Sequence, residues 1–221
     1  MGKKRKDTNE ISKILQEGDK IVIKDDKSDT KAFVPVQIGQ QTVAELVNVD
    51  GGLIKDLPQN ELICDNLLYT LKSPGTIGNI TWFIELKGTK NEKEVRHAIK
   101  QILNTMGYFL DQSTFPMAGR YIEKRDYIFA AVAGAPDKTL PRLIDPDIKK
   151  LCKQLYKLSG KRGNINDMAV LFFYIKPNKS CKKMKLQQNI PPFEIICYST
   201  SEGYITFPHD LMVNVKSCAY P

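Results

Sequence analysis

A glutamate and a lysine stand two residues apart at the end of a strongly apolar segment, W-F-I-E-L-K-G over residues 82–88. Apolar residues along the whole segment predict a central strand that is covered on both faces. Alternate side chains of a strand share a face, so Glu85 and Lys87 are expected to lie side by side. Burying two ionisable groups is costly unless they pair with each other or bind a metal ion.

The preceding strand offers a partner for Glu85. Residues 62–71 and 80–87 both have the pattern of strands, and the Pro-Gly and Gly-Asn pairs in residues 72–79 predict a hairpin loop. If the hairpin is symmetric about Gly75, Asp65 lies opposite Glu85, with Cβ atoms about 5 Å apart. Two facing carboxylates repel each other unless a cation binds between them, and oxygen ligands favour Mg²⁺ or Mn²⁺.

The period of the apolar residues changes to that of a helix after Gly88. Asn91 can cap this helix, and its apolar residues form one stripe: Val95, Ala98, Ile99, Ile102 and Met106. Gln101 lies beside the stripe, on a flank shared with Glu94, His97 and Thr105, so it could reach the strand ends. The alternatives are a boundary polar residue for Gln101 and a surface residue for His97.

Asp65, the step of twenty residues to Glu85-Leu86-Lys87, and the amphipathic helix that follows resemble the PD-(D/E)XK nuclease superfamily. The resemblance covers about residues 43–133. It implies an α/β (α+β) fold, in which a mixed β-sheet is flanked by helices around a restriction-endonuclease-like αβββαβ core.

The same resemblance implies roles for individual residues. Asp65, Glu85 and the Leu86 carbonyl would bind the metal ion, Lys87 would orient the attacking water, and Gln101 would face the site from the helix. Cys64 stands where this family often has proline, which leaves Asp50 as a rival or additional metal ligand.

Basic residues are concentrated in one region of the chain. The formal net charge is +8, yet residues 149–185 hold eleven basic residues and one acidic residue. This asymmetry predicts a flank that binds a polyanion, and a solvated charged surface is the alternative. The residues expected to contact nucleic acid are Lys149, Lys150, Lys153, Lys157, Lys161, Arg162, Lys182 and Lys183.

The remaining patterns predict a single domain over residues 11–221, after a basic, disordered tail at residues 1–10. Further strands are expected at 20–24, 32–38, 127–133, 170–175, 193–198 and 204–207, and helices at 11–17 and 147–158, whereas 41–49 fits either structure. Two histidines and five scattered cysteines disfavour a zinc site, a histidine-based triad and a disulfide framework.

These features predict a metal-dependent endonuclease that hydrolyses double-stranded DNA, of the restriction, phage-defence or repair type. A non-catalytic nucleic-acid-binding module, a nuclease acting on RNA and a scaffold protein remain as alternatives. Cleavage of both strands would favour a homodimer. No apolar stretch is long enough to cross a membrane and the N-terminus lacks the pattern of a secretory signal, so a cytoplasmic, intracellular location is expected.

Overall fold

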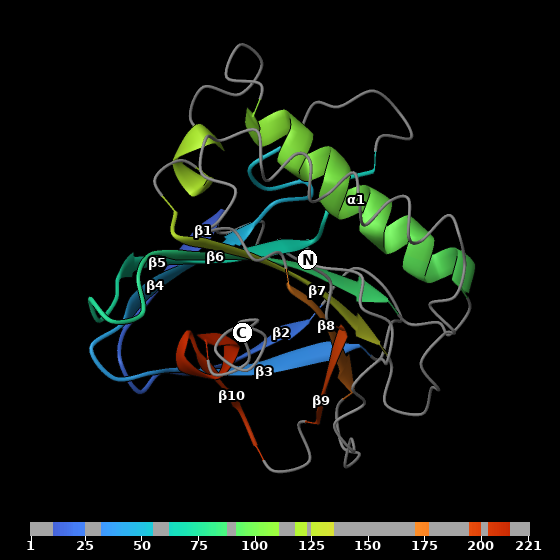
Figure 1. Cartoon of the computed structure of the whole chain (residues 1–221). Helices are drawn as coiled ribbons and strands as arrows, with labels where there is room; N and C mark the ends of the chain where they lie inside the picture. Colours follow the sequence, from blue (N-terminus) through green and yellow to red (C-terminus); the bar gives the residue numbers. More distant parts are fainter. Residues whose placement is uncertain are drawn as a thin grey trace, which may run out of the picture.

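The computed structural model describes residues 11–24, 32–54, 62–87, 92–110, 118–122, 125–134, 171–176, 195–199 and 203–212. These residues form three layers (Figure 1). The helix α1 (Glu92–Leu110) covers one face of a seven-stranded sheet, and a three-stranded sheet lies against the other face. The expected combination of a mixed sheet with a flanking helix is therefore confirmed.

The large sheet changes from antiparallel to parallel at its centre. Its strand order is β1-β4-β5-β6-β7-β8-β9. Neighbouring strands pair antiparallel from β1 through β4 and β5 to β6. They pair parallel from β6 through β7 and β8 to β9. The change occurs at β6 because α1 and the short 3-10 helix η1 (Ala118–Tyr121) follow it, and a parallel neighbour requires such a crossover. The bounds are β1 Ser12–Leu15, β4 Val43–Asn48, β5 Asn66–Lys72, β6 Ile80–Lys87, β7 Tyr127–Gly134, β8 Leu171–Lys176 and β9 Ile195–Ser199.

The small sheet has the order β10-β3-β2, from β2 (Lys20–Lys24), β3 (Phe33–Ile38) and β10 (Ile205–Phe207). These strands were expected as elements, but their separation into a second sheet was not. Trp82 of β6 stacks on Phe207 of β10 with ring centroids 6.2 Å apart and an interplanar angle of 8°. The two sheets thus share one apolar core.

Strand β6 is the centre of both cores, because its residues from Ile80 to Leu86 are all buried. Trp82, Ile84 and Leu86 point towards the small sheet, whereas Phe83 packs in the core beneath α1. Alternation along the strand places Glu85 and Lys87 on the α1 face. The polar residues of β6 therefore point into the space between the sheet and the helix.

The predicted register of the hairpin is confirmed. Asn66 lies opposite Ile84 and Leu67 opposite Phe83. Continuing this register by one residue places Asp65 opposite Glu85.

Two of the expected elements differ from the structure, and the structure decides a third that the sequence left open. The helix predicted at 11–17 is wrong: Ser12–Leu15 is strand β1, paired antiparallel with β4, and pairing outweighs the helical spacing of so short a segment. The ambiguous segment 41–49 contains strand β4. Strand β5 begins at Asn66, four residues later than expected, because residues before it bond to side chains of α1.

The helix predicted at 147–158, the N-terminal tail and the basic flank apart from strand β8 lie outside the described residues. Within the part of the chain that the structure describes, no helix has the length and apolar character needed to cross a lipid bilayer.

We expect Gly52→Ala to destabilise the turn after β4. A Cβ atom at Gly52 would lie 2.3 Å from the carbonyl oxygen of Asn48, which already accepts a hydrogen bond from the Leu53 amide at 2.9 Å. Moving this backbone should lower the free energy of unfolding by about 1–3 kcal/mol. Gly75→Ala is the matched control, because no atom lies within 4 Å of its Cβ position. Equal urea midpoints for the two variants would contradict the expectation.

Candidate active site

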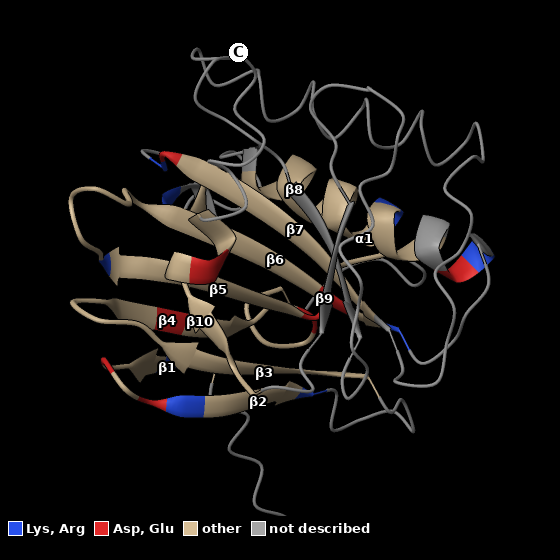
Figure 2. Cartoon of the chain, turned by 60° about the horizontal axis from the view of Figure 1, so that its bottom comes forward, with Lys and Arg blue, Asp and Glu red and all other residues tan. Residues whose placement is uncertain are grey.

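Two carboxylates and a lysine meet where β5 begins and β6 ends. Asp65 directly precedes β5. Glu85 and Lys87 are the last two residues of β6 whose side chains point to the α1 face. Glu85 is fully buried, Asp65 is half-buried and Lys87 is largely buried with its side chain 16% exposed. Figure 2 shows acidic positions near the ends of these strands.

Hydrogen bonds hold the two carboxylates against each other's backbone. The Asp65 amide donates to Glu85 Oε2 at 3.1 Å, and the Leu86 amide donates to Asp65 Oδ2 at 2.7 Å. Lys87 Nζ lies 2.6 Å from Glu85 Oε1. The structure therefore brings together Asp65, Glu85 and Lys87, the three residues that the sequence predicted to meet.

The pKa of Glu85 is raised from 4.5 to about 8, mainly by burial and next by the negative charge of Asp65. Lys87 and the Asp65 amide favour the ionised form but only partly offset these effects. The short contact with Lys87 is consequently not enough to keep Glu85 fully ionised at neutral pH. A divalent cation between the carboxylates would displace this proton.

The backbone amide of Leu86 faces Asp65, because it donates to Asp65 Oδ2 at 2.7 Å. In an extended strand, the N–H and C=O of one residue point to the same side. The Leu86 carbonyl is therefore expected on the side of β6 that faces β5, opposite Cys64 when the hairpin register is continued.

This set of oxygen donors fits a hard divalent cation such as Mg²⁺, which usually keeps several water ligands and needs only one or two carboxylates. The described residues contain no cluster of three or more histidine, cysteine or acidic side chains that could hold a metal. Asp50 is exposed in the turn after β4 and joins no such cluster, although the amide of its neighbour Val49 donates to the Asp65 carbonyl at 3.0 Å.

Side chains of α1 fix the segment that leads into Asp65. Gln101 Nε2 donates to the Ile63 carbonyl at 2.8 Å, and the Cys64 amide donates to Thr105 Oγ1 at 2.9 Å. The Thr105 hydroxyl in turn donates to the Gln101 carbonyl at 2.8 Å. Gln101 is buried and lies next to the site, as its helical position predicted, and it contacts the backbone that carries Asp65.

The sequence did not predict that Thr105 binds the Cys64 amide. The available signal was its position one helical turn after Gln101, on the same side of α1. Its bond to the Cys64 amide gives the residue at position 64 a structural role. A proline at this position would have no N–H to donate to Thr105, so it would remove the bond between this segment and α1. Burial raises the pKa of the Cys64 thiol well above its ordinary value, so the thiol stays protonated.

The basic residues expected to bind nucleic acid are not among those described. Lys149, Lys150, Lys153, Lys157, Lys161, Arg162, Lys182 and Lys183 lie outside the described residues. Within the described part, the basic groups nearest to the carboxylates are on β6 and α1. His97, expected as a surface residue, is half-buried on α1. Burial lowers the pKa of His97, and the positive charge of Lys87 lowers it further.

The chain matches no protein-family model, no curated protein and no solved structure. The geometry of Asp65, Glu85 and Lys87 is therefore what bears on function.

Proposed function

We propose that the protein is a metal-dependent nuclease that hydrolyses phosphodiester bonds of DNA. The observation that carries this proposal is the meeting of Asp65, Glu85 and Lys87 at adjoining strand ends. A structural ion pair needs one carboxylate for one lysine. The second carboxylate adds repulsion, which a bound cation would remove.

In this proposal, each group has a distinct task. Asp65, Glu85 and the Leu86 carbonyl would hold Mg²⁺ or Mn²⁺, which when bound would supply charge neutralisation at the phosphate and a water molecule of lowered pKa. Lys87 orients the attacking water and stabilises negative charge from the protein side. Gln101 and Thr105 are positioning residues, because they hold the backbone at Ile63 and Cys64.

The order of elements supports the same proposal. The chain runs β4, β5, β6, α1, η1 and β7, an order that a restriction-endonuclease-like βββαβ core would also have. Strands β4, β5 and β6 form an antiparallel meander, and β7 returns parallel to β6 after the helix. The excess of basic residues in 149–185 favours a polyanionic substrate.

Calorimetric titration with Mn²⁺ tests the metal site directly. We expect wild-type protein to give a binding isotherm, and Asp65→Ala to abolish it, because the variant loses one of the two carboxylates. Asp50→Ala is the matched control, since it also removes one negative charge but from an exposed side chain that joins no metal-binding cluster among the described residues. Absence of binding to wild-type protein, or equal binding to Asp65→Ala, would contradict the proposal.

A nucleic-acid-binding module without hydrolytic activity is the second candidate. It is favoured because both carboxylates already have partners within the protein. Lys87 pairs with Glu85, and Asp65 accepts a hydrogen bond from the Leu86 amide. This candidate requires DNA binding without an Mn²⁺ isotherm. A nuclease acting on RNA differs from the main proposal only in its substrate.

A further inference from the structure

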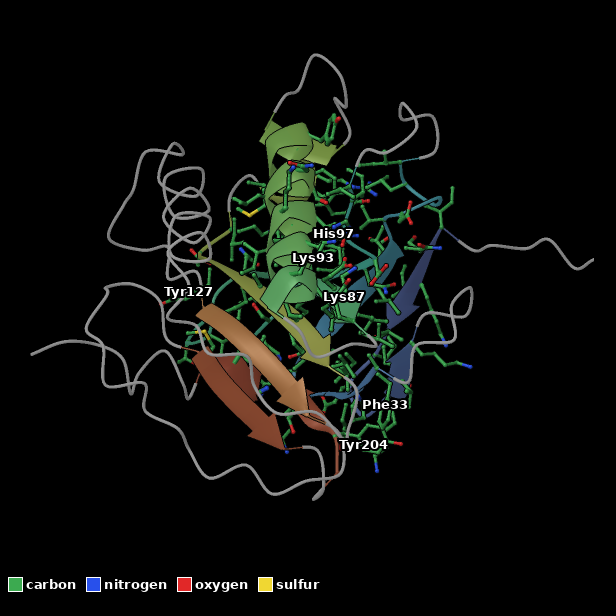
Figure 3. The ribbon with its side chains drawn as sticks, turned by 90° about the vertical axis from the view of Figure 1, so that its right-hand side faces the viewer. Phe33, Lys87, Lys93, His97, Tyr127 and Tyr204 are labelled. Carbon is green, nitrogen blue, oxygen red and sulfur yellow. The ribbon has the colours of Figure 1, made fainter. Side chains whose placement is uncertain are left out.

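One side of α1 carries basic groups at helical spacing. Lys93, His97 and Lys100 follow one another at steps of four and three residues, so they share one face of the helix. Lys93 and Lys100 are exposed, whereas His97 is half-buried. Figure 3 shows Lys93 and His97 on the same side of α1 as Lys87.

Strand β6 adds a fourth basic group to this face. The ammonium group of Lys87 lowers the pKa of His97, and so do Lys93 and Lys100, although burial contributes most. Glu94 is the acidic group that opposes them. Lys93, His97 and Lys100 on α1, together with Lys87 at the candidate active site, are here called the α1 basic strip.

We propose that the α1 basic strip binds the phosphate backbone of double-stranded DNA beside the candidate active site, and that His97 takes up one proton from solvent when the DNA binds. This inference rests on the proposed function for its substrate. It adds where the duplex lies on the protein and how its binding depends on pH.

The dimensions of the strip suit a phosphate backbone. Lys100 is seven positions after Lys93, which is about 10 Å along a helix. One DNA strand advances about 3.4 Å per phosphate along the duplex axis, so the strip corresponds to roughly three phosphates. The lysines supply permanent positive charge, and Lys87 links the strip to the carboxylates.

The charge around His97 explains the proton uptake. In the free protein, burial and three lysines disfavour the imidazolium form, against Glu94 alone, so the imidazole is mainly neutral near pH 7. A bound phosphate would offset the lysine charges and raise the pKa of His97. Binding then takes up a proton at pH values between the free and bound pKa, and the affinity falls as pH rises through that interval.

The test is fluorescence anisotropy with a labelled DNA duplex, in EDTA so that no cleavage occurs. Glu85→Gln protein is the reference, because Glu85 itself titrates near neutral pH. Between about pH 5.5 and pH 7.5, we expect the reference to lose about three- to tenfold more affinity than the Glu85→Gln/His97→Gln variant. His97→Lys in the same background should bind tightly throughout, since its charge is permanent.

The lysines of the strip are tested by salt dependence. Lys93→Gln/Lys100→Gln should reduce the slope of log K against log salt by up to about 2, because each phosphate contact contributes about 0.9. The matched control is Lys13→Gln/Lys72→Gln, which removes the same charge from exposed positions on β1 and β5. An equal pH dependence with and without His97, or an unchanged salt slope in Lys93→Gln/Lys100→Gln, would overturn the inference.

These outcomes are independent of catalysis. If the wild-type protein with Mg²⁺ or Mn²⁺ fails to cleave DNA but shows the pH-dependent and salt-dependent binding, the proposed nuclease function fails while the α1 basic strip stands. If it cleaves DNA but His97 and the two lysines leave binding unchanged, the strip fails while the nuclease function stands.

Discussion

Glu85→Ala and Lys87→Ala are each expected to abolish Mg²⁺-dependent cleavage of plasmid DNA. Among the described residues, Glu85 supplies one of two carboxylates at these strand ends, so in the proposed site its loss should remove metal binding. Lys87 supplies the positive charge that lies 2.6 Å from Glu85, so in the proposed mechanism its loss would remove the group that orients water. Loss of a single charge-stabilising group in an enzyme site typically lowers the rate by about 10²–10³-fold, and loss of the metal should cost more.

The measurement is conversion of supercoiled plasmid to open and linear forms, with linear duplex, single-stranded DNA and RNA as parallel substrates. Lys72→Ala is the matched control for Lys87→Ala, because it removes an exposed lysine from the far end of β5. Circular dichroism should show that the variants are folded. Wild-type activity in both site variants would reject the assignment, and cleavage of RNA alone would change the substrate class.

The metal-free protein is expected to lose stability as pH rises from about 5 to 8, and Glu85→Gln is expected to remove much of this loss. Glu85 has a pKa of about 8 in the folded protein, against an ordinary value of 4.5. Between these values the folded state binds more protons than the unfolded state, so the free energy of unfolding falls with rising pH. Each unit of pKa difference is worth about 1.4 kcal/mol, so the effect should reach a few kcal/mol.

Urea unfolding in EDTA at several pH values measures this effect. Glutamine has nearly the shape of glutamate and does not ionise, so the variant should be more stable than the wild type at pH 8 and closer to it at pH 5. Asp50→Asn is the control, because it neutralises an exposed carboxylate. Mn²⁺ should stabilise the wild type at pH 8 but not Glu85→Gln. Parallel pH profiles for wild type and Glu85→Gln would show that Glu85 is ionised in the folded protein.

Strand β6 could be predicted over its full length, Ile80–Lys87, because apolar residues cover both of its faces and a loop with strong turn residues precedes it. The loop also predicted the register, and with it the meeting of Asp65 and Glu85. Strand β6 and the hairpin register depend on residues that are close in the sequence, so local patterns are enough to predict them.

Other features depend on contacts between distant segments. Strand β1 exists because β4 pairs with it, and its own residues have a helical spacing. The raised pKa of Glu85 follows from the depth of burial under α1, which no local pattern specifies. The bonds from Gln101 and Thr105 to residues 63 and 64 required knowledge of which part of the sheet the helix covers.

The bonds between α1 and the segment before β5 have a mechanical consequence. Asp65 is carried by a short stretch that is tethered to the helix, whereas Glu85 is carried by the central strand of the sheet. A shift of the helix along the sheet would therefore change the separation of the two carboxylates without any rearrangement of the hairpin. A ligand that binds the outer face of α1 and shifts the helix would therefore change the distance between Asp65 and Glu85.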